Sequence, residues 1–563
     1  MSDSHEPMGF VRKYIFSTDH KVIGIQYIVT AIIMAFAGGG LAGLIRLQLS
    51  NPDGAIVSPE TYLSLVTMHG TIMVFFVVSL GLVSGLGNFL IPLHVGARDM
   101  AYPLLNMLSY WTVVPACILM LLSFLAEGGA AAAGWTMYPP LSAVADSVPG
   151  SGMGTTLWLL SMALFIVSFT MGSLNFVATI LNMRAPGLSM MRLPIVLWTY
   201  FISSILGLLS FPALTAAAIM LLFDRHLGTS FFLPAGMVFA DHVLPNQGGT
   251  PLLFQHLFWF LGHPEVYVLV LPAIGVAFDV VATFTRRPPL GYRTTVYSLL
   301  LIAFLSMIVW AHHMFVTGMD PRVGKYFSVA TVLITAPFGV LGVNLLLSLW
   351  KARMRFTVPM MFALGLISAI GAGGLGGLYL GTQTSDVYFH ETYFVVGHFH
   401  LMIGTVTLLG TFAALYYWFP KMFGRHMSTA LGKIHFWVTY PGMVAIFIMM
   451  HYQGLGGMLR RSYDPSVYDY NTPNLVLRLP ITVIAFVVLA AQLVFVWNFF
   501  KSSIWGEKAP ANPWDSASIE WQAASPPPHG NWGEAIPAVH RWPYDYRLPG
   551  ASEEYLPQTT ERA

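Results

Sequence analysis

The chain has 563 residues, of which 56% are hydrophobic and 9% charged, whereas soluble domains carry roughly 25% charged residues. This composition excludes a soluble protein and indicates a polytopic membrane protein. The formal net charge of +2 points to no particular partner, and a single cysteine, Cys117, excludes an internal disulfide or a cysteine-based metal cluster.

Apolar segments of about 20 residues, the length that crosses a bilayer about 30 Å thick, predict an all-α integral membrane fold with about twelve spans. The first 21 residues are polar and lack the apolar core of a secretory signal peptide. The expected spans lie near residues 22–46, 62–93, 101–126, 154–182, 193–223, 252–284, 292–315, 327–350, 358–381, 388–418, 433–455 and 479–503.

These spans form one membrane unit, residues 1–504, with no water-soluble domain between them. Residues 505–563 are polar and Pro-rich, and we expect a cytoplasmic tail that orders on contact with the membrane unit. Lys and Arg are more frequent in the N-terminal arm and the even-numbered connections than in the odd ones. This asymmetry predicts that both termini are cytoplasmic.

Two glycine-rich runs, at 37–43 and 371–381, predict close approach between helices and are explained by packing alone. Histidines within spans are less easily explained, because an ionisable side chain in mid-membrane costs roughly 2.5 to 3.5 kcal/mol. Any single one is explained as a hydrogen-bonded core residue, but six on four spans are not. They are His69, His263, His312, His313, His398 and His400.

The spacing of these histidines suggests which of them act together. His398 and His400 point about 200° apart on one helix, so they suit two planar cofactors on opposite sides, and imidazole is a common haem ligand. His69 facing His400 would complete a six-coordinate haem for electron transfer. Adjacent His312 and His313 can converge near a helix end and, with His263, offer three nitrogens suited to copper or zinc.

The motifs MHGTIMVFF, GHPEVY, WAHHMF, VVGHFH and NPWDSASIEW, together with GNFLIPLHVGARDMAYPLLNMLSYW, resemble those of subunit I of the haem-copper respiratory oxidases. The resemblance extends over essentially the whole chain and is strongest to the branch with mitochondrial and bacterial cytochrome c oxidases. It implies two haems, expected to be A-type, and a copper called CuB. It also implies oxidase subunits II and III as partners, location in the bacterial inner membrane among lipid, and no nucleic acid partner.

The resemblance also assigns residues. His69 and His400 would ligate the low-spin haem, His398 the high-spin haem, and His263, His312 and His313 CuB. Arg46 would contact a low-spin haem substituent, Arg460 and Arg461 the haem propionates, and His390 with Glu391 a magnesium ion.

The stretch GHPEVY places two further chemical groups in the sixth span. Tyr267 follows His263 by four residues on the same helix face, and in the family this pair is covalently linked. The tyrosine can supply one electron and one proton toward the four-electron cleavage of dioxygen. Glu265 lies on another face, where a buried carboxylic acid can store a proton and pass it on.

Protons for Glu265 are expected to enter at Asp99 in the second connection. Asn88 and Asn106 flank Asp99 on the adjoining spans and can hold a file of water. The family names this route the D-pathway. Taken alone, Asp99 would be read as a solvated loop acid.

Three departures from the family pattern stand out. Where the family has a P-T-G-I-K stretch feeding protons to the tyrosine, this chain has Phe338 and Leu341 at the Thr and Lys positions. The usual K-pathway is therefore expected to be absent; Thr335 and Asn344 are polar but cannot replace an ammonium group. Glu391 stands where the family has Asp, and Arg98 where it has Pro.

These features predict a terminal oxidase that reduces dioxygen to water with electrons from cytochrome c or quinol, coupled to proton pumping through Asp99 and Glu265. One alternative is a nitric oxide reductase of the same superfamily, favoured by the missing lysine and opposed by Tyr267 and the Asp99 route. A more remote alternative is a proton-coupled transporter with a buried His and Glu relay.

Overall fold

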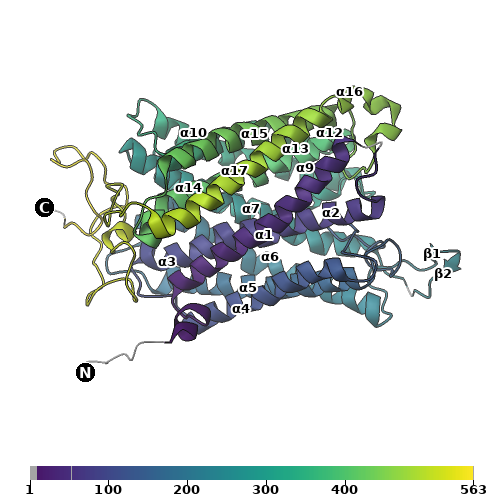
Figure 1. Ribbon diagram of the computed structural model, residues 1–563, viewed down its shortest axis with the longest axis horizontal. Coiled ribbons are helices and arrows are strands. Elements are labelled where there is room, and N and C mark those ends of the chain that lie inside the picture. The colour runs from purple at the N-terminus through teal and green to yellow at the C-terminus, as the bar shows by residue number, and fades with distance from the viewer. Residues whose placement is uncertain (1–8, 52–53, 247, 562–563) are drawn as a thin grey trace.

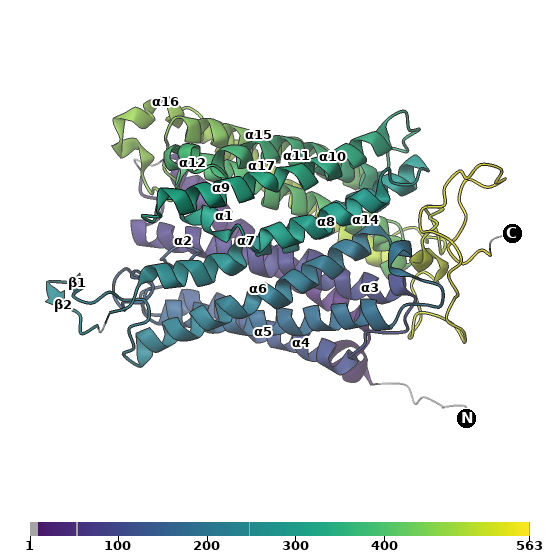
Figure 2. The ribbon, with the colours of Figure 1, turned by 180° about the vertical axis from the view of Figure 1, so that it is seen from behind.

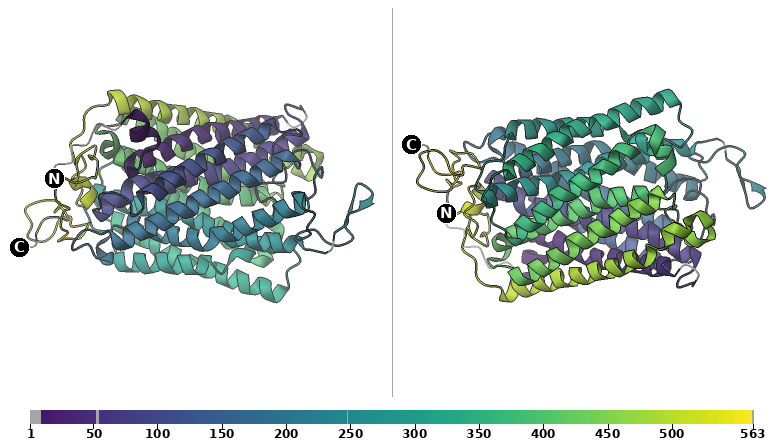
Figure 3. Two further views of the ribbon diagram at one scale, coloured as in Figure 1. Left: turned by 90° about the horizontal axis from the view of Figure 1, so that it is seen from below. Right: turned by 90° about the horizontal axis from the view of Figure 1, so that it is seen from above.

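The computed structural model describes residues 9–51, 54–246 and 248–561, which form a bundle of long helices (Figure 1). Both ends of the chain lie at one end of this bundle, called here the termini end. The opposite end carries a small hairpin of β1 (Val238–Phe239) and β2 (His242–Val243), which projects well beyond the helices (Figure 3). It is called here the hairpin end.

Within the described residues, eleven helical segments are long and apolar enough to cross a membrane, and α8 is a shorter apolar helix. The expectation of about twelve spans is therefore confirmed. The elements from the N-terminus to the hairpin are η1 (Val11–Ile15), α1 (His20–Ser50), α2 (Pro59–Thr71), η2 (Ile72–Leu86), α3 (Gly87–Val95), α4 (Pro103–Leu122), η3 (Ser123–Leu125), α5 (Met153–Asn182), η4 (Met190–Arg192) and α6 (Ile195–His226).

The elements after the hairpin complete the bundle, and Figure 2 shows α8, α9 and α10 on the face behind that of Figure 1. They are α7 (Pro251–Thr285), α8 (Tyr292–Ser306), η5 (Trp310–Met314), α9 (Pro321–Leu333), α10 (Thr335–Leu349), α11 (Val358–Leu380), α12 (Gln383–Phe389), α13 (Tyr393–Phe399), η6 (His400–Thr405), α14 (Val406–Phe423), α15 (Thr429–Leu455), η7 (Pro465–Val467), η8 (Asp469–Asn471), α16 (Thr472–Leu475), α17 (Arg478–Trp505) and η9 (Ile519–Gln522).

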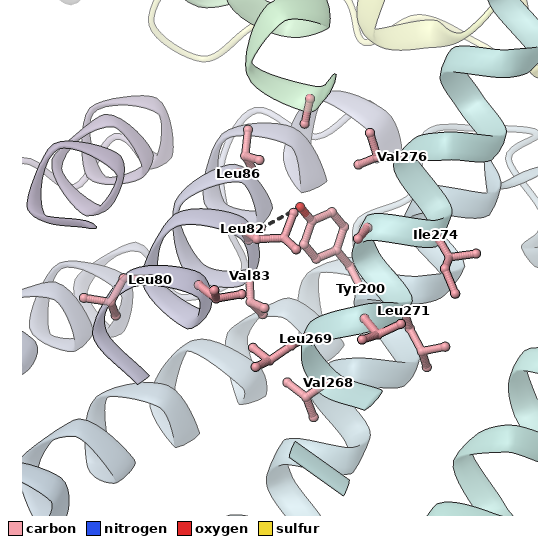
Figure 4. Close-up of a cluster of buried hydrophobic side chains, with 14 of the residues drawn as sticks. Leu80, Leu82, Val83, Leu86, Tyr200, Val268, Leu269, Leu271, Ile274 and Val276 are labelled. Carbon is pink, nitrogen blue, oxygen red and sulfur yellow. Dashed lines mark hydrogen bonds between the residues drawn. The ribbon is translucent and has the colours of Figure 1, made fainter. Parts of the chain in front are cut away.

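Helix α7 lies in the centre of the bundle and is buried along most of its length. It begins where the side chain of Thr250 accepts a hydrogen bond from the backbone N–H of Leu252, with Pro251 in the first turn. At Gly275, an added Cβ would lie 2.7 Å from the Cα of Val196 on α6, so these two helices pack in direct backbone contact. Figure 4 shows the apolar side chains that α7 packs against η2 and α6.

Three expected spans are interrupted rather than continuous. The span at 292–315 is helical only to Ser306, after which the chain turns and forms the 3₁₀ segment η5. The span at 327–350 breaks at Ile334, between α9 and α10, and the one at 388–418 is interrupted at residues 390–392, between α12 and α13. Local hydropathy does not report the first two breaks, because apolar residues continue through them.

The described part of the tail, residues 505–561, is packed against the helices at the termini end (Figure 1). Lys421, at the end of α14, is fully buried and donates hydrogen bonds to the backbone carbonyls of Ala511, Ala523 and Ala524. Arg286, at the end of α7, donates to the carbonyls of Trp514 and Asp515. These buried cations fix the tail to the ends of the two helices.

Candidate functional site

Three histidines meet inside the bundle, His263 from α7 and His312 and His313 from η5. One ring nitrogen from each lies within 4.8 Å of the others, and they form the one group of three or more His, Cys, Asp or Glu side chains found with metal-binding spacing among the described residues. The two adjacent histidines lie in the 3₁₀ segment η5, and their ring centroids are 4.2 Å apart. The break after α8 thus builds this cluster.

The surroundings of the three histidines hold the rings in place. The Nδ1 of His312 lies 3.0 Å from the hydroxyl of Thr331, and Trp259 stacks on His313 with ring centroids 3.8 Å apart. The Nε2 of His263 is buried and has no partner within the protein. Buried polar atoms are almost always partnered, so the orphaned nitrogen fits a metal ligand, and neutral imidazoles suit copper.

A second pair of histidines fits an iron between two rings. His69, on α2, and His400, at the start of η6, face each other with ring centroids 6.5 Å apart and planes 8° from parallel. Their Nδ1 atoms donate hydrogen bonds of 2.9 Å to the carbonyls of Gly38 and Val396, which leaves each Nε2 with a free lone pair. The gap accommodates one metal ion with bonds of about 2 Å to each ring.

His398, on α13, is held by the glycine-rich part of α11. Its Nδ1 donates to the carbonyl of Gly373 at 2.9 Å, and a Cβ added to Gly377 would lie 3.1 Å from its ring carbon Cε1. The run at 371–381 therefore does more than pack helices, since it leaves room for this ring and supplies its hydrogen-bond acceptor.

Gly38 plays the same part for His69, since its carbonyl accepts from that ring. The sequence analysis explained both glycine-rich runs by packing alone, and this was incomplete. Each run also orients one histidine by a backbone carbonyl, which no side-chain pattern signals.

Tyr267 and Glu265 lie one turn or less from His263 on α7. The rings of His263 and Tyr267 meet edge to face with centroids 4.8 Å apart, as the four-residue spacing predicts. Glu265 is buried, and one of its oxygens accepts a hydrogen bond of 3.3 Å from the hydroxyl of Ser79 on η2. The other oxygen is buried without a protein partner, which fits a carboxyl group that exchanges a proton with water.

Asp99 lies in the connection between α3 and α4 at the termini end. Burial raises the pKa of Asp99 to about 6, although the backbone N–H of Met100 donates to its carboxylate at 2.7 Å. The side-chain oxygen of Asn88 and both polar atoms of Asn106 are buried without protein partners. A cavity of about 10 Å³ touches Asn88, which is space for about one water molecule.

Sequence reasoning missed several polar residues on this side of Glu265. The hydroxyl of Tyr27 lies 3.0 Å from that of Ser109 and 3.3 Å from that of Ser168, all three being buried. Ser79 was also missed, as was Thr331 at the three-histidine cluster. Hydroxyl residues are common in membrane helices, where they bond to their own backbone, so their type and spacing carry little signal.

Arginine and acidic side chains gather near the hairpin end, above the histidines. Arg460 binds both oxygens of Glu391, at 2.7 and 2.5 Å. Burial would raise the pKa of Glu391, but the hydrogen bonds and charge of Arg460 prevail and lower it to about 2. His390 bonds instead to Asp386 at 2.9 Å, an acid that the sequence analysis did not single out.

The remaining predicted contact residues lie in this region or beside it. The guanidinium of Arg461 packs against Gly134, where an added Cβ would lie 2.7 Å from its Nη1. Arg46 is buried on α1 and donates to the carbonyl of Arg478 and the hydroxyl of Thr482, while its Nε has no protein partner. The predicted magnesium ligand Glu391 has both oxygens engaged by Arg460, which leaves about one lone pair on each oxygen for an ion.

Comparison with known proteins identifies the family. The family model described as Cytochrome C and Quinol oxidase polypeptide I matches residues 22–487. The chain belongs to this family. It is accordingly the catalytic subunit of a respiratory haem-copper oxidase, an oxidoreductase of electron transport embedded in a membrane.

Individual members of the cytochrome c and quinol oxidase family match over nearly the full chain. The alternative cytochrome c oxidase subunit 1 of Bradyrhizobium diazoefficiens is 45% identical over 557 residues, covering 98% of this chain and 94% of that protein. Cytochrome c oxidase subunit 1 of Thermostichus vulcanus is 40% identical over 542 residues, covering 96% and 94%. A cryo-EM structure of a haem-copper terminal oxidase dimer has the same fold, with a TM-score of 0.70, 18% identity and coverage of 87% and 84%.

Proposed function

We propose that this chain reduces dioxygen to water in a pocket between His398 and the cluster of His263, His312 and His313, with Tyr267 beside it. The haems and copper held by the histidines supply electron transfer and the binding of dioxygen. The observation that carries the proposal is the arrangement itself, in which three imidazoles have metal-binding spacing and one of them, His263, lies against Tyr267.

The protein contributes ligation and orientation in this proposal. His69 and His400, whose rings are 8° from parallel, would hold the low-spin haem, and His398 would hold the high-spin haem. The carbonyls of Gly38, Val396 and Gly373 fix the rings through their Nδ1 atoms. Such outer hydrogen bonds set the tautomer and raise the basicity of the ligating nitrogen.

Tyr267 and Glu265 handle protons at this pocket. The Tyr267 hydroxyl gives up a proton and an electron toward dioxygen cleavage, and its edge contact with His263 fits the covalent link known in the family. Glu265 receives protons through water from Asp99, past Asn106 and Asn88, and passes them to the pocket or to the pumped side. Its unpartnered oxygen supports this part.

The electron donor in this proposal is cytochrome c, because the two relatives described above are named cytochrome c oxidase subunit 1, one of them as an alternative form. Quinol is the alternative donor. We further propose A-type haems, a magnesium ion at His390 and Glu391, oxidase subunits II and III as partners, and location in the bacterial inner membrane. The termini end is then cytoplasmic, as the Lys and Arg asymmetry predicts.

Reduced cytochrome c and reduced quinol, supplied in turn to the purified complex, test the choice of donor. Rapid oxygen uptake with cytochrome c and negligible uptake with quinol supports the proposal, whereas the reverse makes the chain part of a quinol oxidase. Metal analysis of the same sample tests the ligand assignment, for which we expect two haem irons and one copper per chain.

A further inference from the structure

Tyr267 is packed against apolar side chains on the side that faces the termini end. Its ring contacts Phe338 on α10 with centroids 5.9 Å apart. Around this contact lies a cluster of apolar residues from α8, the turn after it, α9 and the α9–α10 break, made of Leu305, Ile308, Val309, Ala330 and Ile334. These apolar residues and Phe338, called here the apolar layer, separate the ring of Tyr267 from the termini end.

Between this apolar layer and the termini end, three helices that pack on one another carry uninterrupted apolar runs. The runs are residues 268–278 of α7, 299–305 of α8 and 336–343 of α10. At 1.5 Å per residue they extend over about 16, 10 and 12 Å. Figure 4 shows part of the α7 run, including Leu271 and Ile274, among buried apolar side chains.

The polar groups beneath these runs are engaged locally. The side-chain amide of Asn344 donates to the carbonyl of Gly291 and to the hydroxyls of Thr294 and Thr295. Asp279 accepts a hydrogen bond from Tyr544 of the tail. Their polar atoms are therefore satisfied at the level of the termini end and do not extend toward Tyr267.

Ser368 of α11 likewise points away from the pocket. Its hydroxyl bonds to the carbonyl of Gly365, 2.8 Å away, and to the hydroxyl of Tyr440 on α15, 2.5 Å away. The polar atom thus faces α15 rather than the runs of α7, α8 and α10.

The region between Asp99 and Glu265 differs from the α10 side, because it contains polar groups. On the Asp99 side, the buried polar atoms without protein partners include those of Asn88, Asn106 and Glu265 itself. Buried unpartnered polar atoms mark water sites. Water is therefore expected along α3 and α4 and not along α10.

We propose that Phe338 and Leu341 close the α10 side of the pocket with a dry seal, so that Asp99 admits the protons for both the reductive and the oxidative half of the reaction. This inference rests on the proposed function. A dry apolar layer of about 10 Å contains no side chain that can accept a proton. Placing a charge within it costs free energy, as it does in the hydrocarbon of a membrane. The cytoplasmic side then reaches Tyr267 only by way of Glu265.

Cysteine labelling tests the seal without relying on catalysis. The native chain has one cysteine, Cys117, which is buried, so introduced thiols can be followed singly. We would place Phe338→Cys, Leu341→Cys and, in the connection after α10, Ala352→Cys in the assembled complex in vesicles, and apply a charged thiol reagent at the termini end. We expect labelling of Ala352→Cys at least about 100-fold faster than of the other two, as their burial beneath apolar residues implies.

Comparable labelling of Leu341→Cys and Ala352→Cys would overturn the seal. Should Phe338→Cys fail to assemble, Leu341→Cys carries the comparison alone, because Leu341 is buried on the same helix. This outcome is independent of whether the complex is an oxidase, so the failure of the seal and the failure of the proposed function are distinguishable.

Proton uptake during the separate half-reactions tests the consequence for Asp99. In anaerobic stopped-flow mixing with reduced donor and a pH-indicator dye, we expect Asp99→Asn to slow both high-spin haem reduction with its proton uptake and the later reaction with oxygen, each by about 100-fold. Adding Phe338→Thr and Leu341→Lys should restore the reductive phase alone. Fast reduction in Asp99→Asn by itself would show a separate proton entry and overturn the inference.

A matched control places the same substitutions on the outer face of α10. Val343 and Leu346 have the same three-residue spacing and are 53% and 58% exposed. Val343→Thr with Leu346→Lys should leave the slow reduction of Asp99→Asn unchanged. Recovery with this control would mean that added charge on α10, rather than opening of the seal, restores proton entry.

Discussion

The imidazoles of His69 and His400 face each other with ring centroids 6.5 Å apart and planes 8° from parallel. Because Nδ1 of each ring is engaged, Nε2 is the nitrogen left to bind a metal ion. Two backbone carbonyls hold them by the opposite nitrogen. Packing alone would bring such rings into van der Waals contact, about 3.5 to 4.0 Å between carbons. The separation is that of two ligands on either side of one metal ion.

Removing one histidine from the three-histidine cluster should release the copper and spare the haem pair. For His312→Ala we expect copper content to fall from about one per chain to near zero, because two imidazoles and no third ligand bind copper poorly. The low-spin haem spectrum should be unchanged, since His69 and His400 are on other segments.

Thr331→Val is the matched control for His312→Ala, because it removes only the hydroxyl at the Nδ1 of His312. We expect copper affinity to fall by about 10- to 100-fold, as for other outer hydrogen bonds to metal ligands. Full copper in His312→Ala would contradict the assignment of the cluster.

Replacing Glu265 by Gln should slow turnover by about 10² to 10⁴-fold, the usual effect of losing a positioned proton-transfer group. The amide keeps the shape of the side chain and its bond to Ser79 but cannot release a proton. Steady-state oxygen consumption by the complex measures the effect, and haem and copper content should be that of the wild type. Ser79→Ala, which leaves the carboxyl group, should retain most of the activity.

Asp99 should give turnover a pH dependence centred near 6. A donor with a pKa of about 6 is about one-tenth protonated at pH 7 and about one-hundredth at pH 8. Proton entry should therefore be fastest below pH 6 and fall about tenfold per unit above pH 7. Asp99→Asn should be slow and lack this dependence, whereas activity that is flat from pH 5.5 to 8.5 in the wild type would contradict the role of Asp99.

The stability of Asp99→Asn should move in the opposite direction from its activity. The pKa of Asp99 is higher in the folded protein, about 6, than its ordinary value of 3.8, so the folded state holds the proton more tightly. Stability contributed by this group is present below pH 3.8 and lost as pH rises through 6. Thermal unfolding at pH 8 should therefore find the Asn variant at least as stable as the wild type.

Lys421 should be required for the docked tail. Lys421→Met removes a buried cation that donates to three tail carbonyls and should weaken docking by about 3 kcal/mol. Limited proteolysis should then cut residues 511–524 faster than in the wild type. Lys501→Met, at an exposed position of α17, serves as the control, and equal cleavage in both variants would contradict the role of Lys421.

Sequence patterns located the spans and the histidines because the two signals are strong. Long apolar runs predict membrane helices. Six ionisable side chains within them indicate a functional site, because burying each one in the membrane costs free energy. The convergence of His312 and His313 was expected at a helix end or distortion, and the structure places them on η5, beyond the end of α8.

Other parts of the site depend on tertiary contacts that sequence spacing does not encode. The pairing of Arg460 with Glu391 brings together residues 69 positions apart. The carbonyls of Gly38 and Gly373 belong to the backbone, so no residue type marks them. The breaks at Ile334 and after Ser306 lie within apolar sequence, so hydropathy does not indicate where the helix ends.

Oxygen uptake by the purified complex, measured beside nitric oxide uptake under anaerobic conditions with the same reduced donor, tests the central claim most directly. The account predicts fast, cyanide-sensitive oxygen consumption and slow loss of nitric oxide, because Tyr267 and Glu265 lie where oxygen reduction needs an electron and protons. Fast nitric oxide loss with feeble oxygen uptake would contradict it and identify a nitric oxide reductase, in which Phe338 closes a route that the reaction does not require.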